Sequence, residues 1–455
     1  MSDETIELAR FVAGLAPEAI PQAVLERARH LSMDLAGSIV RAGREAESTP
    51  SLFATIEALG LSGPGASSIV GMDRTLAPPV AALVNGMLGH SLDFDDTHAD
   101  SSLHPSAPVV PAALAVGEMV GASGAEIVAA IVAGYEVCCR LGNALDPTSH
   151  YARGFHPTAT AGTFGAAAAA GKLLRLDAAG IATAFGVSGS QAAGSLQFLV
   201  NGAWNKRWQV GAAAMNGVFA AMLARQGFKG AAQPIEGRHG LLAGYSDAGD
   251  PAKAVAGLGS VWETMRIGMK PYPSCRYTHA ALDGLLALRR ERGLEASDVE
   301  AVTVGLHRNG ITLTGDPLEE KRRARTVVDG QFSMPFVASV ALDSGAFGWD
   351  DYRRLGEPAL ERICERIDVV RDERLEGLAH PFGATIRVTT GGTVLERHIA
   401  DPSGEPETFP DAASVRRKFL GLAEPVLAGE AARLADLFET LSERAALGAA
   451  LRGPA

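Results

Sequence analysis

Cysteine is scarce in this chain, with four among 455 residues. Cys138 and Cys139 are adjacent, while Cys275 and Cys364 lie far along the chain, so no CxxC pair is formed. This spacing excludes a zinc ribbon and a thioredoxin-type site, and it is not the clustered spacing of a cubane iron–sulfur centre. We therefore expect reduced thiols in a cytoplasmic protein.

The chain also has fewer positive than negative side chains. It contains 41 Lys and Arg and 52 Asp and Glu, which gives a net charge of -11. Such a chain is a poor candidate for binding nucleic acid or an anionic membrane. No basic stretch precedes an apolar one at the N-terminus, so we expect no signal peptide. No phosphate-binding glycine motif is found, which disfavours nucleotide chemistry.

Long apolar runs without polar residues are absent as well. The longest uncharged run, 178–205, carries several Ser, Gln and Gly residues. This run is too polar to face lipid and predicts a buried segment of a soluble protein instead.

The length of the chain favours two domains. Up to about residue 267 the sequence has helical periodicity and is rich in Ala and Gly, which indicates closely packed helices. Alternation at Val302–His307 and a Gly391-Gly392 turn before Thr393–Ile399 predict strands and a hairpin. We expect a mainly α protein with an all-helical domain at 1–267, a smaller α+β domain at 268–400, and 401–455 returning to the helical domain.

Lys206 and Arg207 are the only charged residues between 178 and 224. An unpaired buried charge is unfavourable, so each cation needs an anionic partner. The partner is either an internal Asp or Glu or a bound carboxylate. The alternative is a surface turn that leaves both side chains in water.

A second cluster, within residues 90–104, includes three histidines and three closely spaced aspartates: His90, Asp93, Asp95, Asp96, His98 and His104. One interpretation is acid–base chemistry, because a carboxylate can orient a histidine and tune its pKa. Another is a divalent metal site formed by Asp93, Asp96, His98 and His104. The third is structural, with the Asp and Thr side chains capping local backbone groups.

Two further segments contain candidate residues. His156 precedes a predicted helix at Pro157, where it is either a capping residue or part of a site that attracts anions. The segment from Lys270 to His279 contains two prolines and two cations, with Arg276 the second. It is either a connector with solvated charges or part of a site at the domain boundary.

Together the clusters supply histidines for proton transfer and cations for carboxylates. Removing or delivering a proton next to a carboxylate requires cations that stabilise the negative charge that develops. The combination predicts elimination, decarboxylation or epimerisation of a small acidic substrate.

The chain resembles the MmgE/PrpD family, which contains 2-methylcitrate dehydratase, cis-aconitate decarboxylase and iminodisuccinate epimerase. The resemblance covers nearly the whole chain. It rests on the following motifs: His90-Ser91-Leu92-Asp93-Phe94-Asp95-Asp96-Thr97 with His104-Pro105-Ser106, Gly134-Tyr135-Glu136-Val137, His156-Pro157-Thr158, Lys206 with Gly211, Lys270 with Tyr272-Pro273, Thr278-His279, and Phe332-Ser333-Met334-Pro335.

The resemblance implies a large helical domain, a smaller α+β lid domain, a homodimer and a site that needs no cofactor or metal. It also implies catalytic roles for five residues: His104 and His156 in proton transfer, Asp93 in orienting one of them, Lys206 in holding a substrate carboxylate, and His279 in binding substrate or relaying a proton. The expected substrate-binding residues are Thr97, Arg207, Gln209, Lys270 and Arg276. Gln209 stands where many relatives have histidine, and an amide cannot titrate.

The expected function is that of a cofactor-independent lyase, a dehydratase or decarboxylase of a citrate-like or aconitate-like polycarboxylate. The alternative is an epimerase of an imino- or amino-dicarboxylate such as iminodisuccinate. A metal-dependent hydrolase and a non-catalytic helical binding protein are the remaining hypotheses.

Overall fold

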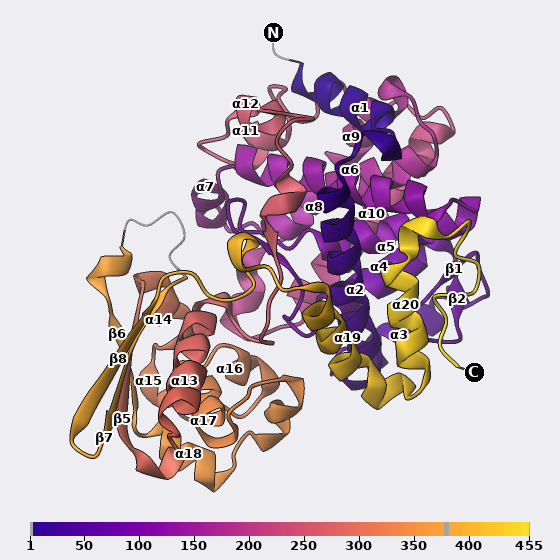
Figure 1. The fold of residues 1–455 in the computed structure, drawn as a ribbon. Helices are drawn as coiled ribbons and strands as arrows, with labels where there is room; N and C mark the ends of the chain where they lie inside the picture. The colour runs from indigo at the N-terminus through magenta and orange to yellow at the C-terminus, as the bar shows by residue number, and fades with distance from the viewer. Residues whose placement is uncertain (1–2, 377–381, 455) are drawn as a thin grey trace. The chain divides into compact units, whose positions relative to one another are not determined.

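Residues 3–376 and 382–454 are described by the computed structural model of the protein, and the chain divides into two compact units. The first unit combines Met1–Met269 with Asp411–Ala455, and the second comprises Lys270–Pro410. Figure 1 shows that the first is built of helices and the second of helices and one larger sheet. The prediction of a mainly α protein with a smaller α+β part is confirmed.

The first unit consists almost entirely of helices. The segments between them contain two short antiparallel strand pairs. Its helices are α1 (Glu4–Gly14), α2 (Gln22–Glu45), α3 (Thr49–Ala58), α4 (Pro78–Gly89), α5 (Ser106–Val120), α6 (Gly124–Ala144), α7 (Pro147–Ala152), α8 (Pro157–Leu173), α9 (Ala178–Ser188), α10 (Asn205–Arg225), α11 (Leu241–Tyr245), α12 (Pro251–Val255), α19 (Ala412–Leu427) and α20 (Glu430–Glu439). Its strands are β1 (Ser67–Ser68), β2 (Thr75–Leu76), β3 (Thr97–His98) and β4 (Ile267–Gly268), paired β1 with β2 and β3 with β4. Among residues 3–376 and 382–454, no helix combines the length and apolar character needed to cross a membrane.

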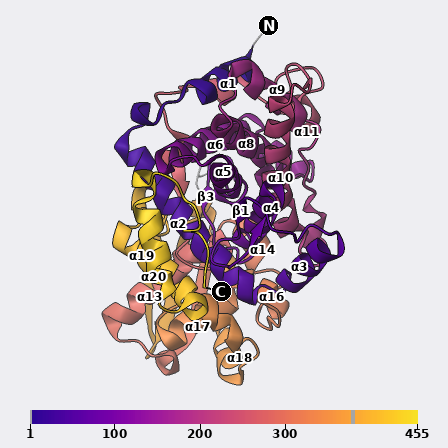
Figure 2. The ribbon, with the colours of Figure 1, turned by 90° about the vertical axis from the view of Figure 1, so that its right-hand side faces the viewer.

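Helix α5 lies at the centre of this unit. Figure 2 looks nearly along α5 and shows α4, α6, α8 and α10 around it. Its residues from Ser106 to Gly117 are all buried. The small residues expected from the sequence therefore allow one helix to be covered by neighbours on every side.

The second unit packs helices against a four-stranded sheet of order β6-β5-β7-β8. Its strands are β5 (Val299–Leu306), β6 (Ile367–Arg371), β7 (Ala384–Thr390) and β8 (Thr393–Ile399), and its helices are α13 (His279–Arg292), α14 (Arg308–Thr314), α15 (Leu318–Lys321), α16 (Val327–Gln331), α17 (Met334–Ser344) and α18 (Pro358–Cys364). β5 pairs in parallel with β6 and antiparallel with β7. The predicted hairpin is confirmed, with Thr390 opposite Thr393 across the turn.

The core of the second unit is formed by alternate residues of the sheet and by the apolar sides of α13 and α17. Val302 and Val304 of β5 and Ile386 and Val388 of β7 are at most 1% exposed. Side chains two apart on a strand point to the same face, so these four residues line one surface. Leu282, Leu285, Val337 and Val340 of the helices belong to the same apolar cluster.

One prediction about the uncharged run 178–205 was wrong in its second half. The run is helical and largely buried only as far as α9, which ends at Ser188. In the segment that follows, Leu199 and Val200 belong to a short 3₁₀ helix, Leu196–Val200, and are 56% and 75% exposed. Apolar composition alone does not bury a segment, because a loop with no packed partner leaves its side chains in water.

The close contact of α8 and α10 supports a stability prediction. A Cβ atom at Gly217 of α10 would lie 2.4 Å from the Cβ of Ala166 and 2.6 Å from the main-chain nitrogen of Ala167. We expect Gly217→Ala to lower the free energy of unfolding by about 1–3 kcal/mol, because the helices must move apart. Gly421→Ala in α19 is the control. A Cβ there meets nothing within 4 Å, so alanine stabilises by up to about 1 kcal/mol through helix propensity. Urea denaturation measures both, and equal effects would contradict the packing argument.

Candidate active site

Three histidines of the first unit lie close together although they come from different segments. His90 follows the end of α4, His104 precedes α5, and His156 is the residue before α8. The His90 ring centroid lies 5.0 Å from that of His104 and 6.0 Å from that of His156. The structure thus places both predicted proton-transfer residues around a third imidazole.

His90 is held by a carboxylate. Its Nδ1 lies 2.7 Å from Oδ2 of Asp95, and both side chains are fully buried. Burial lowers the pKa of His90, while the neighbouring Asp95 carboxylate opposes that shift. Both residues belong to the cluster at 90–104 but not to the predicted site residues. Their five-residue spacing gave no indication that they would pair.

His104 has its tautomer set by the main chain. Its Nδ1 lies 2.6 Å from the carbonyl oxygen of Asp96. Because a carbonyl only accepts, Nδ1 donates the proton, and in the neutral ring Nε2 then carries the lone pair. The main-chain nitrogen of His104 also donates to Oγ1 of Thr158 at 3.1 Å. Thr97, a predicted substrate-binding residue, has its Oγ1 3.5 Å from the same Nδ1.

The Asp96 side chain has a structural role. Its carboxylate accepts hydrogen bonds from the main-chain nitrogen and the hydroxyl of Ser106, at 3.2 and 2.7 Å. Burial raises the pKa of Asp96 well above its usual value, and the nearby Asp95 adds to the shift. These bonds tie the loop to the first residue of α5 and so position the carbonyl that binds His104.

His156 is a buried ring whose hydrogen-bond partner is a neutral amide. It is 2% exposed, and its Nδ1 lies 3.3 Å from Oε1 of Gln209. The Gln209 amide donates its own N–H to the carbonyl of Ser195 at 2.8 Å, which sets the orientation of the amide. Nδ1 of His156 therefore donates, and Nε2 carries the lone pair. Burial and then the positive charges of His90, Lys206 and His104 hold its pKa well below the usual 6.5.

Lys206, in the first turn of α10, has an internal carboxylate partner. Its Nζ lies 2.7 Å from Oδ1 of Asp93, with 24% and 10% of the two side chains exposed. Asp93 adopts a positive φ of 52°, a conformation that Asp and Asn tolerate better than most residues. Of the two partners expected for Lys206, the structure shows the internal one. The neighbouring Arg207 is buried and donates to Oγ of Ser48 at 3.3 Å.

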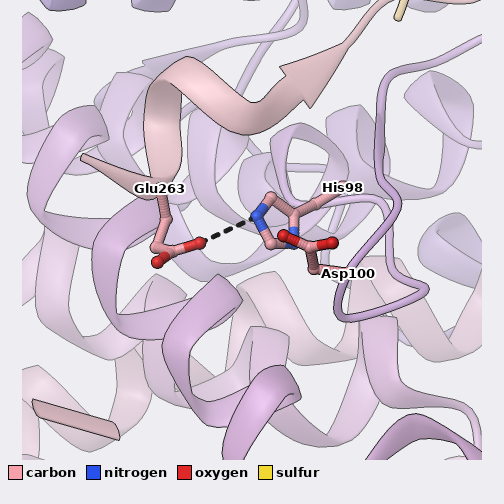
Figure 3. A group of neighbouring side chains, drawn as sticks. All are labelled: His98, Asp100 and Glu263. Carbon is pink, nitrogen blue, oxygen red and sulfur yellow. Dashed lines mark hydrogen bonds and ion pairs between the residues drawn. The ribbon is translucent and has the colours of Figure 1, made fainter. Parts of the chain in front are cut away.

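The residues of the metal hypothesis do not form one group in the part of the chain that the structure describes. Asp93 bonds Lys206, Asp96 bonds Ser106, and His104 bonds a carbonyl. His98 joins a different group, with Asp100 and Glu263, whose potential ligand atoms lie within 4.8 Å of one another (Figure 3).

His98 makes hydrogen bonds through both ring nitrogens. The main-chain nitrogen of Ser101 donates to Nδ1 at 3.3 Å, so Nε2 carries the proton and donates to Oε2 of Glu263 at 3.1 Å (Figure 3). The contact with Glu263 links β3 itself to the segment that leads into β4. The arrangement explains His98 as a structural residue that holds the short β3–β4 pair.

The other predicted site residues belong to the second unit. Lys270 is buried there. Arg276 donates to Oε1 of Glu405 at 2.8 Å and to Nδ1 of His279 at 2.8 Å. Nε2 of His279 then donates to the carbonyl of Ser274 at 3.1 Å. Both ring nitrogens of His279 thus have partners within this unit, and a substrate would have to replace one of them.

The low pKa of His156 predicts a pH dependence of stability. Its pKa is lower in the folded protein than the usual 6.5 of an unfolded chain. Below about pH 6.5 the unfolded state binds a proton that the folded state does not, so the free energy of unfolding falls as the pH decreases. We expect His156→Gln to reduce this slope by up to about 1.4 kcal/mol per pH unit. Urea denaturation between pH 5 and 8 measures it, and equal slopes would contradict the prediction.

The fold and the site together define a helical protein in which one unit holds three neighbouring imidazoles, two of them buried, a carboxylate bonded to one of these rings, and a lysine. This set is suited to proton transfer on an anionic molecule. The chain belongs to the MmgE/PrpD family. Residues 6–254 match the MmgE/PrpD N-terminal domain, and residues 272–443 match the MmgE/PrpD C-terminal domain. The family resemblance noted in the sequence is confirmed.

Relatives at about 30% identity extend over most of the chain. Cis-aconitate decarboxylase-like protein oryM of Aspergillus oryzae is 28% identical to this chain, and the match covers 94% of this chain and 92% of the relative's own length. Cis-aconitate decarboxylase of Aspergillus terreus is 30% identical, covering 90% and 87%. Cis-aconitate decarboxylase of Homo sapiens is 29% identical, covering 65% and 62%. The prediction of an enzyme of the lyase class is confirmed by this kinship.

Proposed function

We propose that this chain is a cofactor-independent lyase that decarboxylates or dehydrates a small citrate-like or aconitate-like polycarboxylate. The observation that carries the proposal is the grouping of three imidazoles with the Lys206–Asp93 pair, whose charges act on the His90 ring. The names of the relatives, which are cis-aconitate decarboxylases, support an aconitate-like substrate.

Lys206 is the proposed carboxylate ligand. Its ammonium group is bound to Asp93, and the Lys206 side chain as a whole is 24% exposed. A substrate carboxylate is proposed to share the ammonium group with Asp93 or to take the place of Asp93. A point charge that holds one carboxylate also stabilises the negative charge that develops on the adjacent carbon. Arg207 bonds Ser48 in this structure, and its proposed part in substrate binding is secondary.

His104 and His156 are the proposed proton-transfer residues. In the unliganded protein His156 is neutral because burial and cationic neighbours disfavour its charge. A bound polyanion reverses part of that effect, since negative charge nearby favours imidazolium. In decarboxylation the C–C bond breaks, carbon dioxide leaves, and the electron pair left on carbon takes the proton of an imidazolium. In dehydration a neutral imidazole removes the proton from carbon, and the electron pair of that bond forms the C=C bond. The second ring, as imidazolium, gives its proton to the departing hydroxyl, which leaves as water.

Gln209 supports this assignment. By accepting from Nδ1 of His156, its amide leaves the lone pair on Nε2. A glutamine cannot titrate, so it orients the ring without competing for the proton. Thr97 lies against His104 and is proposed to orient substrate beside that ring. Roles for Lys270, Arg276 and His279, like the homodimer and the cytoplasmic location, stay predictions.

NMR spectroscopy in deuterated water tests the proposal directly. Purified protein is incubated with cis-aconitate, citrate, methylcitrate and a set of dicarboxylates. We expect loss of one tricarboxylate, with release of carbon dioxide or water and, for decarboxylation, one solvent deuterium on a product carbon. Deuterium exchange with neither release would instead support the epimerase alternative, with an imino- or amino-dicarboxylate as substrate. No conversion of any compound would refute the proposed function.

A further inference from the structure

The proposed reaction gives no role to the His90–Asp95 pair. His90 is 2% exposed, and its Nδ1 donates to the Asp95 carboxylate at 2.7 Å. No described residue forms a hydrogen bond with its Nε2, although that atom is buried. A buried polar atom without a partner is unfavourable and needs a reason.

The partner of His90 differs in charge from the partner of His156. The Nδ1 of His156 bonds a neutral amide, that of Gln209. A proton on His156 would therefore create a buried charge beside a neutral group, whereas a proton on His90 would complete a buried ion pair with Asp95. Desolvation penalises an unpaired buried charge much more than a paired one.

The two rings also influence each other. They are stacked with a centroid distance of 6.0 Å and an interplanar angle of 30°. At this distance in a buried site, two positive rings repel each other strongly, so the charge of one disfavours the charge of the other.

We propose that the His90–Asp95 pair is the proton store of this site: His90 takes up a proton before His156 does, and its charge keeps His156 neutral. His90 is thus a positioning residue, acting on the protonation of a proposed catalytic ring. The inference deepens the proposed function and rests on it for its link to catalysis. The stored proton comes from solvent and returns to solvent.

The other charges around His90 modulate this balance. Asp93 favours a positive His90, and Lys206 disfavours it. Those two bond each other, so their opposite effects partly cancel. Asp95 is in direct contact with the His90 ring, and its negative charge then makes His90 the more favourable of the two imidazoles to protonate. His104, 5.0 Å away, adds a further repulsion when it is charged.

Nitrogen NMR of selectively labelled histidines in the full-length protein tests the order of protonation without any substrate. Between pH 5 and 8 we expect the His90 ring nitrogens to reach imidazolium shifts at higher pH than those of His156. In His90→Asn, whose amide can still donate to Asp95, the titration of His156 should move up by as much as about 2 pH units. Protonation of His156 before His90, or an unmoved His156 in the variant, would overturn the inference.

Asp95→Asn is the matched variant, because its amide oxygen can accept from Nδ1 while the charge is lost. We expect His90 in this variant to titrate at lower pH than in the unmodified protein, and an unchanged His90 would count against the proposal. Assaying the unmodified enzyme on the polycarboxylate panel distinguishes a failure of the proposed lyase function from a failure of the proton-store proposal. If it converts nothing, the proposed function fails, while the order of the two titrations still decides the proton store.

Discussion

His104→Asn is expected to reduce kcat on the converted polycarboxylate by about 10²–10⁴-fold, the usual contribution of a positioned acid or base. The asparagine amide can still donate to the Asp96 carbonyl, which accepts from Nδ1 of His104 at 2.6 Å. The variant therefore removes the Nε2 lone pair while the loop keeps its hydrogen bond. Because the loss affects the transition state, kcat should fall much more than KM rises.

The control for this prediction is His239→Asn, at an exposed histidine of the same unit. It makes the same chemical change without touching the imidazole cluster, and we expect full turnover. Thermal denaturation of both variants checks that each is folded. A folded His104→Asn protein with a kcat within threefold of the unmodified enzyme would remove His104 from the proposed mechanism.

Lys206→Met is expected to raise KM for a polycarboxylate and to lower kcat/KM by roughly 10²-fold or more, as the loss of a charge-assisted contact of about 3 kcal/mol implies. The same change leaves the Asp93 carboxylate, 10% exposed, without its lysine. The variant should therefore also lose stability. Activity and stability fall for different reasons, so a second substitution can separate them.

Asp93→Asn supplies that separation, because asparagine tolerates the φ of 52° at this position. In the double variant Lys206→Met with Asp93→Asn, no carboxylate is left without its lysine, so much of the lost stability should return. The loss in kcat/KM should persist, since the substrate still lacks its cation. Urea denaturation and steady-state kinetics on all four proteins measure the two coupling energies. Recovery of activity along with stability would show that Lys206 has only a structural role.

Much of the fold could be predicted from local patterns. The Gly391-Gly392 turn produced the hairpin of β7 and β8, because two residues of positive φ suit a tight turn between strands. The Ala and Gly content of α8 and α10 predicted close contacts between helices. At Gly217 of α10 the approach to α8 is so close that a Cβ atom would overlap with Ala166. The same reasoning failed for residues 189–204, where uncharged composition suggested burial and the loop is largely exposed.

The residue types of the site could be predicted, but most of its pairings could not. Asp93 appeared to be the carboxylate that orients a histidine, yet it bonds Lys206, 113 residues away. Asp95 is the carboxylate at a histidine, His90. Three aspartates within four residues look alike in a sequence, and the direction of each side chain depends on the path of the loop between α4 and β3.

Composition, periodicity and local motifs were enough to predict the helical and α+β parts, the family, and the histidines, lysine and carboxylates available for chemistry. The pairings within the site could be seen only in the folded protein. The rings of His90, His104 and His156 lie together, Lys206 forms an ion pair with Asp93, and both nitrogens of His279 are bonded within its unit. Such pairings depend on distances between segments far apart in sequence, because the packing of whole helices sets those distances.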